Sequence, residues 1–411
     1  MTSTLAETTG TYRERPLDGR TIALGVTGSI SAYKAADLAS KLRQAGATVE
    51  VLMTEAATRF IAPLTFQSLT GQAAIVDMFE TEEAEAHVEV ARRADAFLIA
   101  PATADCLARL AYGGGGDMVT LTALATTAPV VVAPAMDSQM WANAAVEANV
   151  GALIERGVEV VGPAEGRLAS GRFGAGRLAE TPAILGAVRA AIGRREGDLC
   201  GRAVIVTAGG TQEPLDPVRY IGNRSSGRMG FSLAAAARDR GARVSLVTGP
   251  SQLTTPYGVD RIDVKTVEEM LGALEPLTER CDALLMAAAP ADFRPLEASG
   301  QKIKKATLNE DDMTLPLTET PDIISTLPGG GVRVAFAAET ENLKANATAK
   351  LAAKRADFIV ANDVTAAGSG FGTETNEVTI FHREGEAERL PLLSKYAVAH
   401  AILDRVAARL T

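Results

Sequence analysis

The stretch GVTGSISAYKAADLASKLRQAGATVEVLM, residues 25–53, decides the fold of the first half of the chain. The apolar run at residues 21–24 predicts a buried strand, residues 25–29 a glycine-containing turn, and residues 30–45 a helix that Gly46 ends. Residues 49–53 form the next apolar run and complete a β-α-β unit. Further strands are expected at residues 96–100 and 130–133, each followed by a loop that contains proline.

A second opening of the same kind, VTAGGTQEPLDPVRYIGNRSSGRMG at residues 206–230, heads the other half of the chain. Apolar runs predict strands at residues 203–207, 243–247, 283–286, 332–336 and 358–360. Helices are expected at 231–240 and 394–410, with a hairpin from residue 377 to the stretch before Leu390. The chain is thus predicted to hold two Rossmann-like α/β domains.

The domain limits follow from changes in composition. We expect a flexible N-terminus at residues 1–18, a first domain at 19–192 and a second at 201–411. The last helix of the first domain is expected at residues 181–192. The polar, glycine-punctuated residues 193–200 then form the linker.

Composition excludes several classes of function. The 411 residues carry a net charge of -9, so the chain lacks the surplus of Lys and Arg that neutralises nucleic-acid phosphates. Cys106, Cys200 and Cys281 are too widely spaced for a disulfide framework or a zinc site. No apolar run approaches the roughly 20 residues of a membrane span. We therefore expect a soluble, cytoplasmic protein whose substrates are small molecules.

The turn that contains Gly25, Gly28 and Ser29 predicts a phosphate site. Glycine lets the backbone approach a ligand, and the start of the following helix offers unpaired N–H groups. A dinucleotide site of this type has an acidic residue at the end of the second strand, where it binds ribose hydroxyls. Because Met53 and Thr54 stand there instead, a mononucleotide such as FMN is favoured over NAD.

The loop after the strand at 203–207 predicts a second anion site, because it concentrates small and cationic residues before a helix. For any one of these residues, a solvated loop that satisfies its own backbone is the alternative. No GxxxxGK[ST] motif occurs, which disfavours a P-loop. Further residues suit the phosphates and the ribose or metal of a nucleoside triphosphate, namely Asp292, Lys302, Lys350 and Lys354.

The motifs HVEVARRADAFLIAPATADCLARLA, residues 87–111, and APAMDSQMW, residues 133–141, resemble the FMN-dependent cysteine decarboxylases typified by phosphopantothenoylcysteine decarboxylase. This resemblance implies a flavodoxin-like domain in which His87 acts as a base while FMN oxidises the substrate thiol and carbon dioxide is lost. The loop with Met136, Met140 and Trp141 is expected to fold over the substrate. The implied FMN contacts are Gly28, Ser29, Ile30, Thr54, Ser68, Pro101, Ala102 and Thr103.

Three positions depart from the family pattern. Asp105 and Asp137 stand where Asn is usual, and Ser170 stands where a proton-donating Cys is usual. Asp137 and Ser170 therefore occupy catalytic positions with altered chemistry, since a thiol gives up a proton far more readily than a serine hydroxyl. Cys106 is a candidate substitute donor, although a small buried filler is the favoured interpretation for it.

The motifs TAGGTQEPLDPVRYIGNRSSGRMG, AAAPADFRP, KIKK, TPDI, FAAET and AND resemble phosphopantothenate:cysteine ligase of the bacterial, CTP-using type, over residues 201–408. The resemblance implies that CTP activates a carboxylate as an acyl-cytidylate that the cysteine amine attacks. Asn223 and Lys302 would be catalytic, Arg219 and Asn223 would bind substrate, and Asp292 would bind the nucleotide near Mg2+. The implied CTP contacts are Met286, Ala287, Ala288, Asp292, Lys302, Thr320, Pro321, Asp322, Ile323, Phe336, Lys350 and Lys354, with Thr320 in place of the usual Asn.

Both resemblances in one chain imply a bifunctional enzyme of coenzyme A synthesis, because the product of the ligase, 4'-phosphopantothenoylcysteine, is the substrate of the decarboxylase. They also imply a homo-oligomer with a trimeric flavin domain and a dimeric ligase domain. One alternative is a ligase-only enzyme whose first domain binds FMN for assembly. An FMN-binding regulatory or scaffold protein is another. A short-chain NAD(P) reductase is disfavoured, since no Tyr-x-x-x-Lys pair is evident on a helix.

Overall fold

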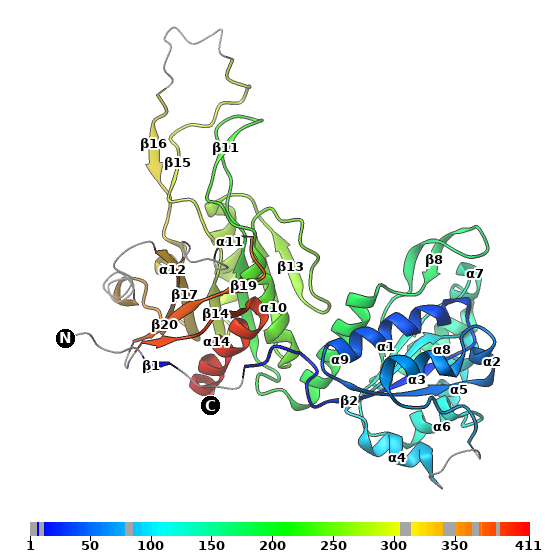
Figure 1. The fold of residues 1–411 in the computed structure, drawn as a ribbon. Coiled ribbons are helices and arrows are strands. Elements are labelled where there is room, and N and C mark those ends of the chain that lie inside the picture. Colours follow the sequence, from blue (N-terminus) through cyan, green and yellow to red (C-terminus); the bar gives the residue numbers. More distant parts are fainter. Residues whose placement is uncertain are drawn as a thin grey trace. The chain divides into compact units, whose positions relative to one another are not determined.

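The chain forms two compact units in the computed structural model, which describes residues 6–7, 12–78, 85–304, 314–339, 351–363, 370, 372–383 and 387–411. The first unit comprises residues 15–197. The second unit comprises residues 198–411 together with the described residues before Arg15. Each unit has its own sheet and its own buried core (Figure 1).

The first unit is built on a parallel five-stranded sheet in the order β3-β2-β4-β5-β6. Its strands are β2 (Thr21–Val26), β3 (Thr48–Met53), β4 (Ala96–Ala102), β5 (Val130–Pro134) and β6 (Glu159–Val160). Numbered along the chain, this is the 2-1-3-4-5 order of flavodoxin-like folds. The predicted fold class of this half is confirmed.

Helices cover both faces of this sheet. A buried apolar cluster joins Ala23, Phe97 and Val132 of the sheet to the helices of one face. These are α4 (Ala86–Arg93), α5 (Ala104–Tyr112), α6 (Met118–Ala125) and α8 (Ala144–Glu155). The helices that pack against the sheet from the other side are α1 (Lys34–Gln44), α3 (Pro63–Thr70) and α9 (Thr181–Glu196) (Figure 1).

Short elements lie at the carboxyl ends of the strands. They are the 3-10 turn η1 (Ile30–Tyr33), α2 (Glu55–Thr58), α7 (Ser138–Trp141) and the hairpin of β7 (Ala164–Arg167) and β8 (Phe173–Arg177). Ser29 caps η1 by accepting a hydrogen bond from the Ser31 N–H at 3.2 Å. The helix predicted over residues 30–45 is therefore one 3-10 turn followed by α1.

The second unit contains a nine-stranded sheet in the order β1-β21-β20-β18-β17-β14-β9-β12-β13. The strands from β13 to β18 pair in parallel, whereas β20 pairs antiparallel with β18 and with β21. Taken along the chain, the parallel strands have the 3-2-1-4-5-6 order of dinucleotide-binding Rossmann folds. The strands are β1 (Ala6–Glu7), β9 (Ala203–Ala208), β12 (Arg243–Thr248), β13 (Asp260–Asp263), β14 (Ala283–Met286), β17 (Val332–Glu339), β18 (Phe358–Asp363), β20 (Val378–His382) and β21 (Glu388–Arg389).

Two apolar clusters lie on opposite faces of this sheet. One cluster includes residues of α10 (Arg228–Asp239) and α14 (Lys395–Leu410), and the other includes residues of α11 (Val267–Thr278) and α12 (Ile323–Thr326). The predicted C-terminal hairpin and final helix are confirmed. Strands β19 (Thr375–Asn376) and β22 (Leu393–Ser394) pair with each other beside α14.

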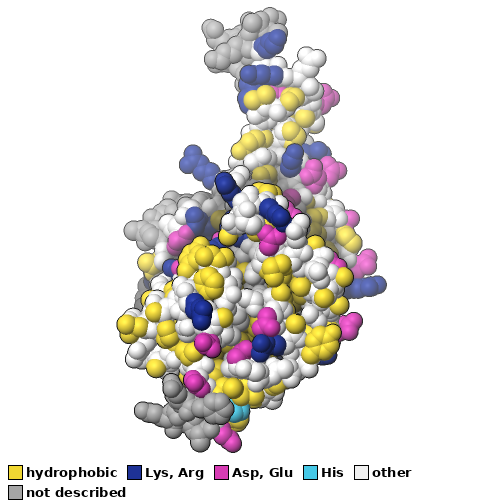
Figure 2. Space-filling view, turned by 90° about the vertical axis from the view of Figure 1, so that its right-hand side faces the viewer, with side chains coloured by type: hydrophobic (Ala, Val, Ile, Leu, Met, Phe, Trp, Pro, Cys, Tyr) yellow, Lys and Arg dark blue, Asp and Glu magenta, His cyan; other side chains and the backbone are white. Residues whose placement is uncertain are grey.

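An extended arm rises from the second unit (Figure 1). It is formed by two antiparallel strand pairs, β10 (Glu213–Pro214) with β11 (Tyr220–Ile221) and β15 (Phe293–Pro295) with β16 (Leu317–Glu319). Figure 2 shows hydrophobic side chains exposed along it. The exposed apolar residues of the arm are Val218, Tyr220, Phe293, Leu296 and Leu317.

The expected flexible N-terminus and linker need correction. Strand β1 pairs in parallel with β21, and Leu17 is buried with 2% of its surface exposed, so these parts of residues 1–18 are ordered. Helix α9 runs on to Glu196 rather than ending at Ile192, which places four of the eight expected linker residues in a helix. The boundary between the two units lies between Gly197 and Asp198. In the part of the chain that the structure describes, no helix is long and apolar enough to cross a membrane.

Candidate functional sites

A cavity of about 460 Å³ lies where the strand order of the first unit reverses, between the carboxyl ends of β2 and β4. We call it the switch-point cavity. Ligands of open α/β sheets bind at this place. Thr54 and Thr103 line the cavity and cap the helices that follow them, accepting hydrogen bonds from the N–H groups of Ala57 and Cys106 at 3.2 and 3.3 Å. Because each threonine oxygen accepts, its hydroxyl hydrogen remains available to a ligand.

Gly28 lets the turn after β2 pack closely against α2. A Cβ atom at this position would lie 2.5 Å from the Cβ of Ala56, a distance that side chains do not tolerate. Three of the predicted FMN residues, Gly28, Thr54 and Thr103, line the switch-point cavity. Its size and its convergent backbone and hydroxyl groups fit a mononucleotide such as FMN.

The other predicted FMN residues do not line this cavity. Ser29 and Ile30 line a neighbouring one, while Pro101 and Ala102 are buried at the end of β4. Ser68 is exposed on α3, where its hydroxyl donates to the Leu64 carbonyl at 2.9 Å. The structure of a single chain therefore does not bring Ser68 to either cavity.

One departure from the family pattern, Asp105, borders the switch-point cavity. Asp105 accepts a hydrogen bond from Arg109 Nε at 2.9 Å, and Asp117 lies 3.9 Å from the same guanidinium. Cys106 is 3% exposed, and burial raises the pKa of its thiol. The expected burial of Cys106 is confirmed, while its assignment as a small filler rather than a proton donor stays a prediction.

A second cavity of the first unit, of about 560 Å³, is enclosed by the turn after β2, the loop after β5 and the β7–β8 hairpin. We call it the hairpin cavity. Its lining includes Met136 and three cationic side chains, Lys34, Arg167 and Arg177. This charge favours an anionic ligand. Met140 instead lines the switch-point cavity, and Trp141 packs against the apolar core.

Asp137 and Ser170 meet at the edge of the hairpin cavity. The Ser170 hydroxyl donates to Asp137 Oδ2 at 2.6 Å, and Arg172 Nη1 lies 3.4 Å from Oδ1. The hydrogen bond from Ser170 lowers the pKa of the Asp137 carboxyl. The two positions at which this chain departs most from the family pattern are therefore direct partners.

His87 lies apart from both cavities of its own chain. It is half-buried in the first turn of α4, and it lines neither the switch-point cavity nor the hairpin cavity. The structure of one chain does not bring this predicted base to the other predicted residues.

In the second unit, the glycine-rich loop after β9 is hydrogen-bonded to the loop after β14. The Ala289 N–H donates to the Gly209 carbonyl at 2.8 Å, and the Asn223 amide donates to the Pro290 carbonyl at 2.7 Å. A Cβ at Gly210 would lie 2.5 Å from the Asn223 carbonyl oxygen, so only glycine allows this approach. The two predicted motifs act as one structural element, with Asn223 between them.

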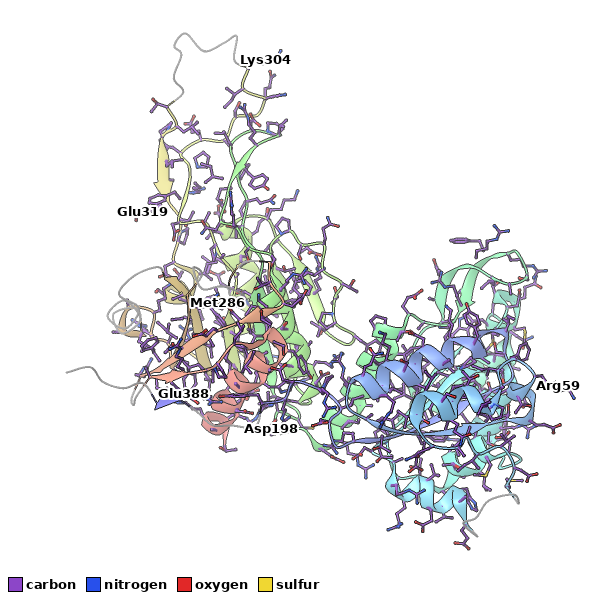
Figure 3. The ribbon with its side chains drawn as sticks, in the orientation of Figure 1. Arg59, Asp198, Met286, Lys304, Glu319 and Glu388 are labelled. Atoms are coloured by element: carbon purple, nitrogen blue, oxygen red, sulfur yellow. The ribbon has the colours of Figure 1, made fainter. Side chains whose placement is uncertain are left out.

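A cavity of about 320 Å³ lies beyond these loops, at the carboxyl ends of β14 and β17. We call it the β14–β17 cavity. Of the predicted CTP contacts, the ones that line it are Met286, Ala288, Asp292, Thr320, Pro321, Asp322, Ile323, Phe336 and Lys354. Ala287 packs against the core instead, and Lys350 lies outside the described residues. Figure 3 labels two lining residues, Met286 near the base of the arm and Glu319 on the arm.

Thr320 and Lys354 are held by protein groups at this cavity. The Thr320 hydroxyl donates to the Ala291 carbonyl at 2.5 Å, and the Thr320 N–H donates to the Asp292 carbonyl at 3.0 Å. Lys354 Nζ lies 3.7 Å from Asp322 Oδ2. The threonine that replaces the family's Asn therefore supports the segment that carries Asp292.

Lys302 and Arg219 lie on the arm and not in the β14–β17 cavity. The Arg219 guanidinium binds Asp216 and donates to the Ile303 carbonyl at 2.8 Å. The hydrogen bond from Arg219 lowers the pKa of Asp216. Figure 3 shows the nearby Lys304 far along the arm from Met286. A single chain thus separates two predicted residues from the other predicted nucleotide contacts: Lys302, expected to be catalytic and to contact CTP, and Arg219, expected to bind substrate.

Arg333 is a site-supporting residue that sequence reasoning missed. It is 4% exposed, and its guanidinium donates to the carbonyls of Ile324 and Leu327 at 3.0 and 3.1 Å and also to that of Pro328. These bonds satisfy the end of α12, whose first residue, Ile323, lines the cavity. An arginine inside the apolar strand VRVAF was the available signal.

Asp292 is the predicted metal ligand, and it is exposed beside the β14–β17 cavity. Across the described residues, no three His, Cys, Asp or Glu side chains come together in a way that could hold a metal ion. A magnesium ion at this place would need nucleotide phosphates as its other ligands, which is how this ion binds in most nucleotide sites.

Family models match both units. The flavoprotein family matches residues 11–193, and the C-terminal domain of the DNA/pantothenate metabolism flavoproteins matches residues 199–410.

The similarity to curated proteins extends over nearly the whole chain. The coenzyme A biosynthesis bifunctional protein CoaBC of Vibrio cholerae is 44% identical over 396 residues, which cover 95% of this chain and 98% of that protein. The protein of the same name from Bacillus subtilis is 43% identical, with the same coverage. Among solved structures, the FMN-dependent cysteine decarboxylase SpaF is 30% identical over 42% of this chain and 98% of its own, with a TM-score of 0.37.

Proposed function

This chain belongs to the family of bifunctional coenzyme A biosynthesis proteins, and we propose that it joins 4'-phosphopantothenate to cysteine and then decarboxylates the product to 4'-phosphopantetheine. The relatives carry both units in one chain, as this protein does. The observation that carries the proposal is the β14–β17 cavity, because nine residues predicted to contact the nucleotide line it together.

We propose that the second unit performs the ligation with CTP. The carboxylate oxygen of 4'-phosphopantothenate attacks the α-phosphorus of CTP and releases pyrophosphate. The cysteine amine then attacks the acyl carbon, an amide bond forms, and CMP leaves. Lys354 and Asp292 at the cavity suit the phosphates and the nucleotide, and Asn223 holds the loops where the acyl group would lie. Mg2+ is assigned to the nucleotide phosphates with Asp292 nearby.

We propose that the first unit binds FMN in the switch-point cavity and the substrate in the hairpin cavity. Gly28, Thr54 and Thr103 would hold the flavin nucleotide, and bound FMN would supply reversible two-electron oxidation of the substrate thiol. Lys34 and Arg167 would attract the substrate's anionic groups. Because Asp137 and Ser170 bind each other, we do not assign the proton-donor role to Ser170.

We further propose that the protein is a homo-oligomer, with trimeric contacts of the first unit and dimeric contacts of the second. His87 and Lys302 are each separated from the cavities of their own chain, so a neighbouring subunit must supply them if they act there. The exposed apolar side chains of the arm suit a contact with a second copy. Light scattering coupled to size exclusion measures the oligomer size.

The test is product analysis with the full chain. Purified protein would be incubated with 4'-phosphopantothenate, cysteine, CTP, Mg2+ and FMN, and the products resolved by mass. Formation of 4'-phosphopantetheine is expected. If no cysteine amide forms, the ligase assignment is refuted. If the amide accumulates without loss of carbon dioxide, the ligase-only alternative holds. His87→Asn should stop decarboxylation and leave ligation intact.

A further inference from the structure

The β7–β8 hairpin forms one wall of the hairpin cavity, through Arg167, Leu168, Ala169 and Ser170. Its β8 side is anchored by backbone, because the Met136 N–H donates to the Gly176 carbonyl at 3.0 Å. A Cβ at Gly176 would lie 2.2 Å from the Met136 carbonyl oxygen, so this approach requires glycine. The anchor lies at the end of the hairpin, away from its turn at residues 168–172.

The turn of the hairpin is attached through the Asp137 carboxylate. Ser170 donates to Oδ2 at 2.6 Å, and Arg172 lies 3.4 Å from Oδ1. The Gln139 N–H donates to Oδ1 at 3.0 Å and fixes the carboxylate at the start of α7. One side chain after β5 therefore connects two residues of the turn to the body of the unit.

The same geometry decides what these groups can do with protons. A carboxylate that accepts from a hydroxyl and a backbone amide and lies beside a guanidinium is stabilised in its ionised form, so it is not an acid. The Ser170 hydrogen is directed at Asp137 and is therefore not offered to a ligand in this arrangement. Neither group is set up as a proton donor. Both are set up to hold the turn in place.

We propose that Asp137 and Ser170 are a matched pair of positioning residues that latches the β7–β8 hairpin over the substrate in the hairpin cavity. The inference rests on the proposed decarboxylation for the identity of the substrate. A carboxylate needs a strong donor opposite it, and a hydroxyl supplies a stronger hydrogen bond than a thiol. The departures at positions 137 and 170 are therefore coupled, because the carboxylate of Asp137 and the hydroxyl of Ser170 serve as acceptor and donor of one hydrogen bond.

The experiment compares the purified full chain with Asp137→Asn, Ser170→Ala and the double variant. Hydrogen exchange of the backbone amides at residues 164–177 reports opening of the hairpin without any substrate. Ser40→Ala is the matched control, because it removes an exposed hydroxyl that accepts a hydrogen bond within α1. Each single variant should speed exchange by roughly 3- to 10-fold, the double variant should add little, and the control should change nothing.

Steady-state decarboxylation of 4'-phosphopantothenoylcysteine provides the second readout. A lost latch should raise KM with a smaller change in kcat, since the closed hairpin contacts bound substrate throughout the reaction. If Ser170→Ala lowers kcat while KM and hairpin exchange stay unchanged, Ser170 acts as a catalytic acid and the latch is refuted. Additive effects on exchange would also refute it. If the wild-type protein forms no decarboxylated product, the proposed function fails, whereas the exchange measurement still decides the latch.

Discussion

Thr320→Val tests whether the Thr320 hydroxyl supports the nucleotide cavity. The substitution keeps the side chain's shape and removes one hydrogen bond, from the hydroxyl to the carbonyl of the buried Ala291, with a separation of 2.5 Å. A neutral hydrogen bond contributes about 1 kcal/mol, and a buried acceptor left without a partner costs roughly 1–3 kcal/mol. We expect a loss of about 1–2 kcal/mol in nucleotide binding, which corresponds to roughly a 5- to 30-fold rise in KM for CTP.

The assay is pyrophosphate release at saturating 4'-phosphopantothenate and cysteine. Because the hydroxyl supports the cavity in the ground state and the transition state alike, kcat should change little. Thr320→Ser keeps the hydroxyl and is the matched control, so its KM should stay within about twofold of wild type. An unchanged KM in Thr320→Val would refute the role of the hydroxyl. A loss confined to kcat would instead place Thr320 at the reacting atoms.

Three further predictions concern FMN binding, the pH dependence of stability and the reactivity of cysteines. Gly28→Ala should weaken FMN binding by at least tenfold, because the new Cβ collides with α2. Flavin fluorescence measures this binding. Gly151→Ala is the control and should leave FMN binding unchanged, since a Cβ at Gly151 meets nothing within 4 Å. The pKa of Asp216 is lowered, so its carboxylate stabilises the fold above the ordinary pKa of about 3.9 and this contribution is lost as the pH falls. The difference in urea midpoint between wild type and Asp216→Asn should therefore shrink below about pH 4, and a constant difference would contradict the ion-pair explanation. In the native protein iodoacetamide should label the exposed Cys200 and spare the buried Cys106, as mass spectrometry of peptides would show.

The two sheets were predictable because their signals are local. The first opening, at residues 21–53, contains an apolar strand, a glycine turn and a helix within a short stretch. The second opening has the same parts, with an apolar strand at residues 203–207, a glycine-rich loop and a helix expected at residues 231–240. The arm was not predicted, since β15 pairs with β16 across a long sequence separation, from Pro295 to Leu317, and β10 and β11 are only two residues long. Strand β1 escaped prediction for the same reason.

The sequence predicted which residues belong to the sites better than it predicted how these residues lie relative to one another. The motif at residues 286–288 and the TPDI motif at residues 320–323 lie together in the β14–β17 cavity, apart from Ala287. The sequence contains no sign that Asp137 and Ser170, 33 residues apart, would touch, because each position was read against a different motif. For Lys302 the motif predicted a position in the same loop system as Asp292, yet Lys302 does not line the β14–β17 cavity. The nearby Lys304 lies far along the arm (Figure 3).

Strand β1 is paired with β21, although the whole first unit follows it in the chain. The first unit is in this sense an insertion into the second. During synthesis β1 leaves the ribosome long before its partner exists, so it must wait while the first unit folds and can join its sheet only when the C-terminal segment emerges.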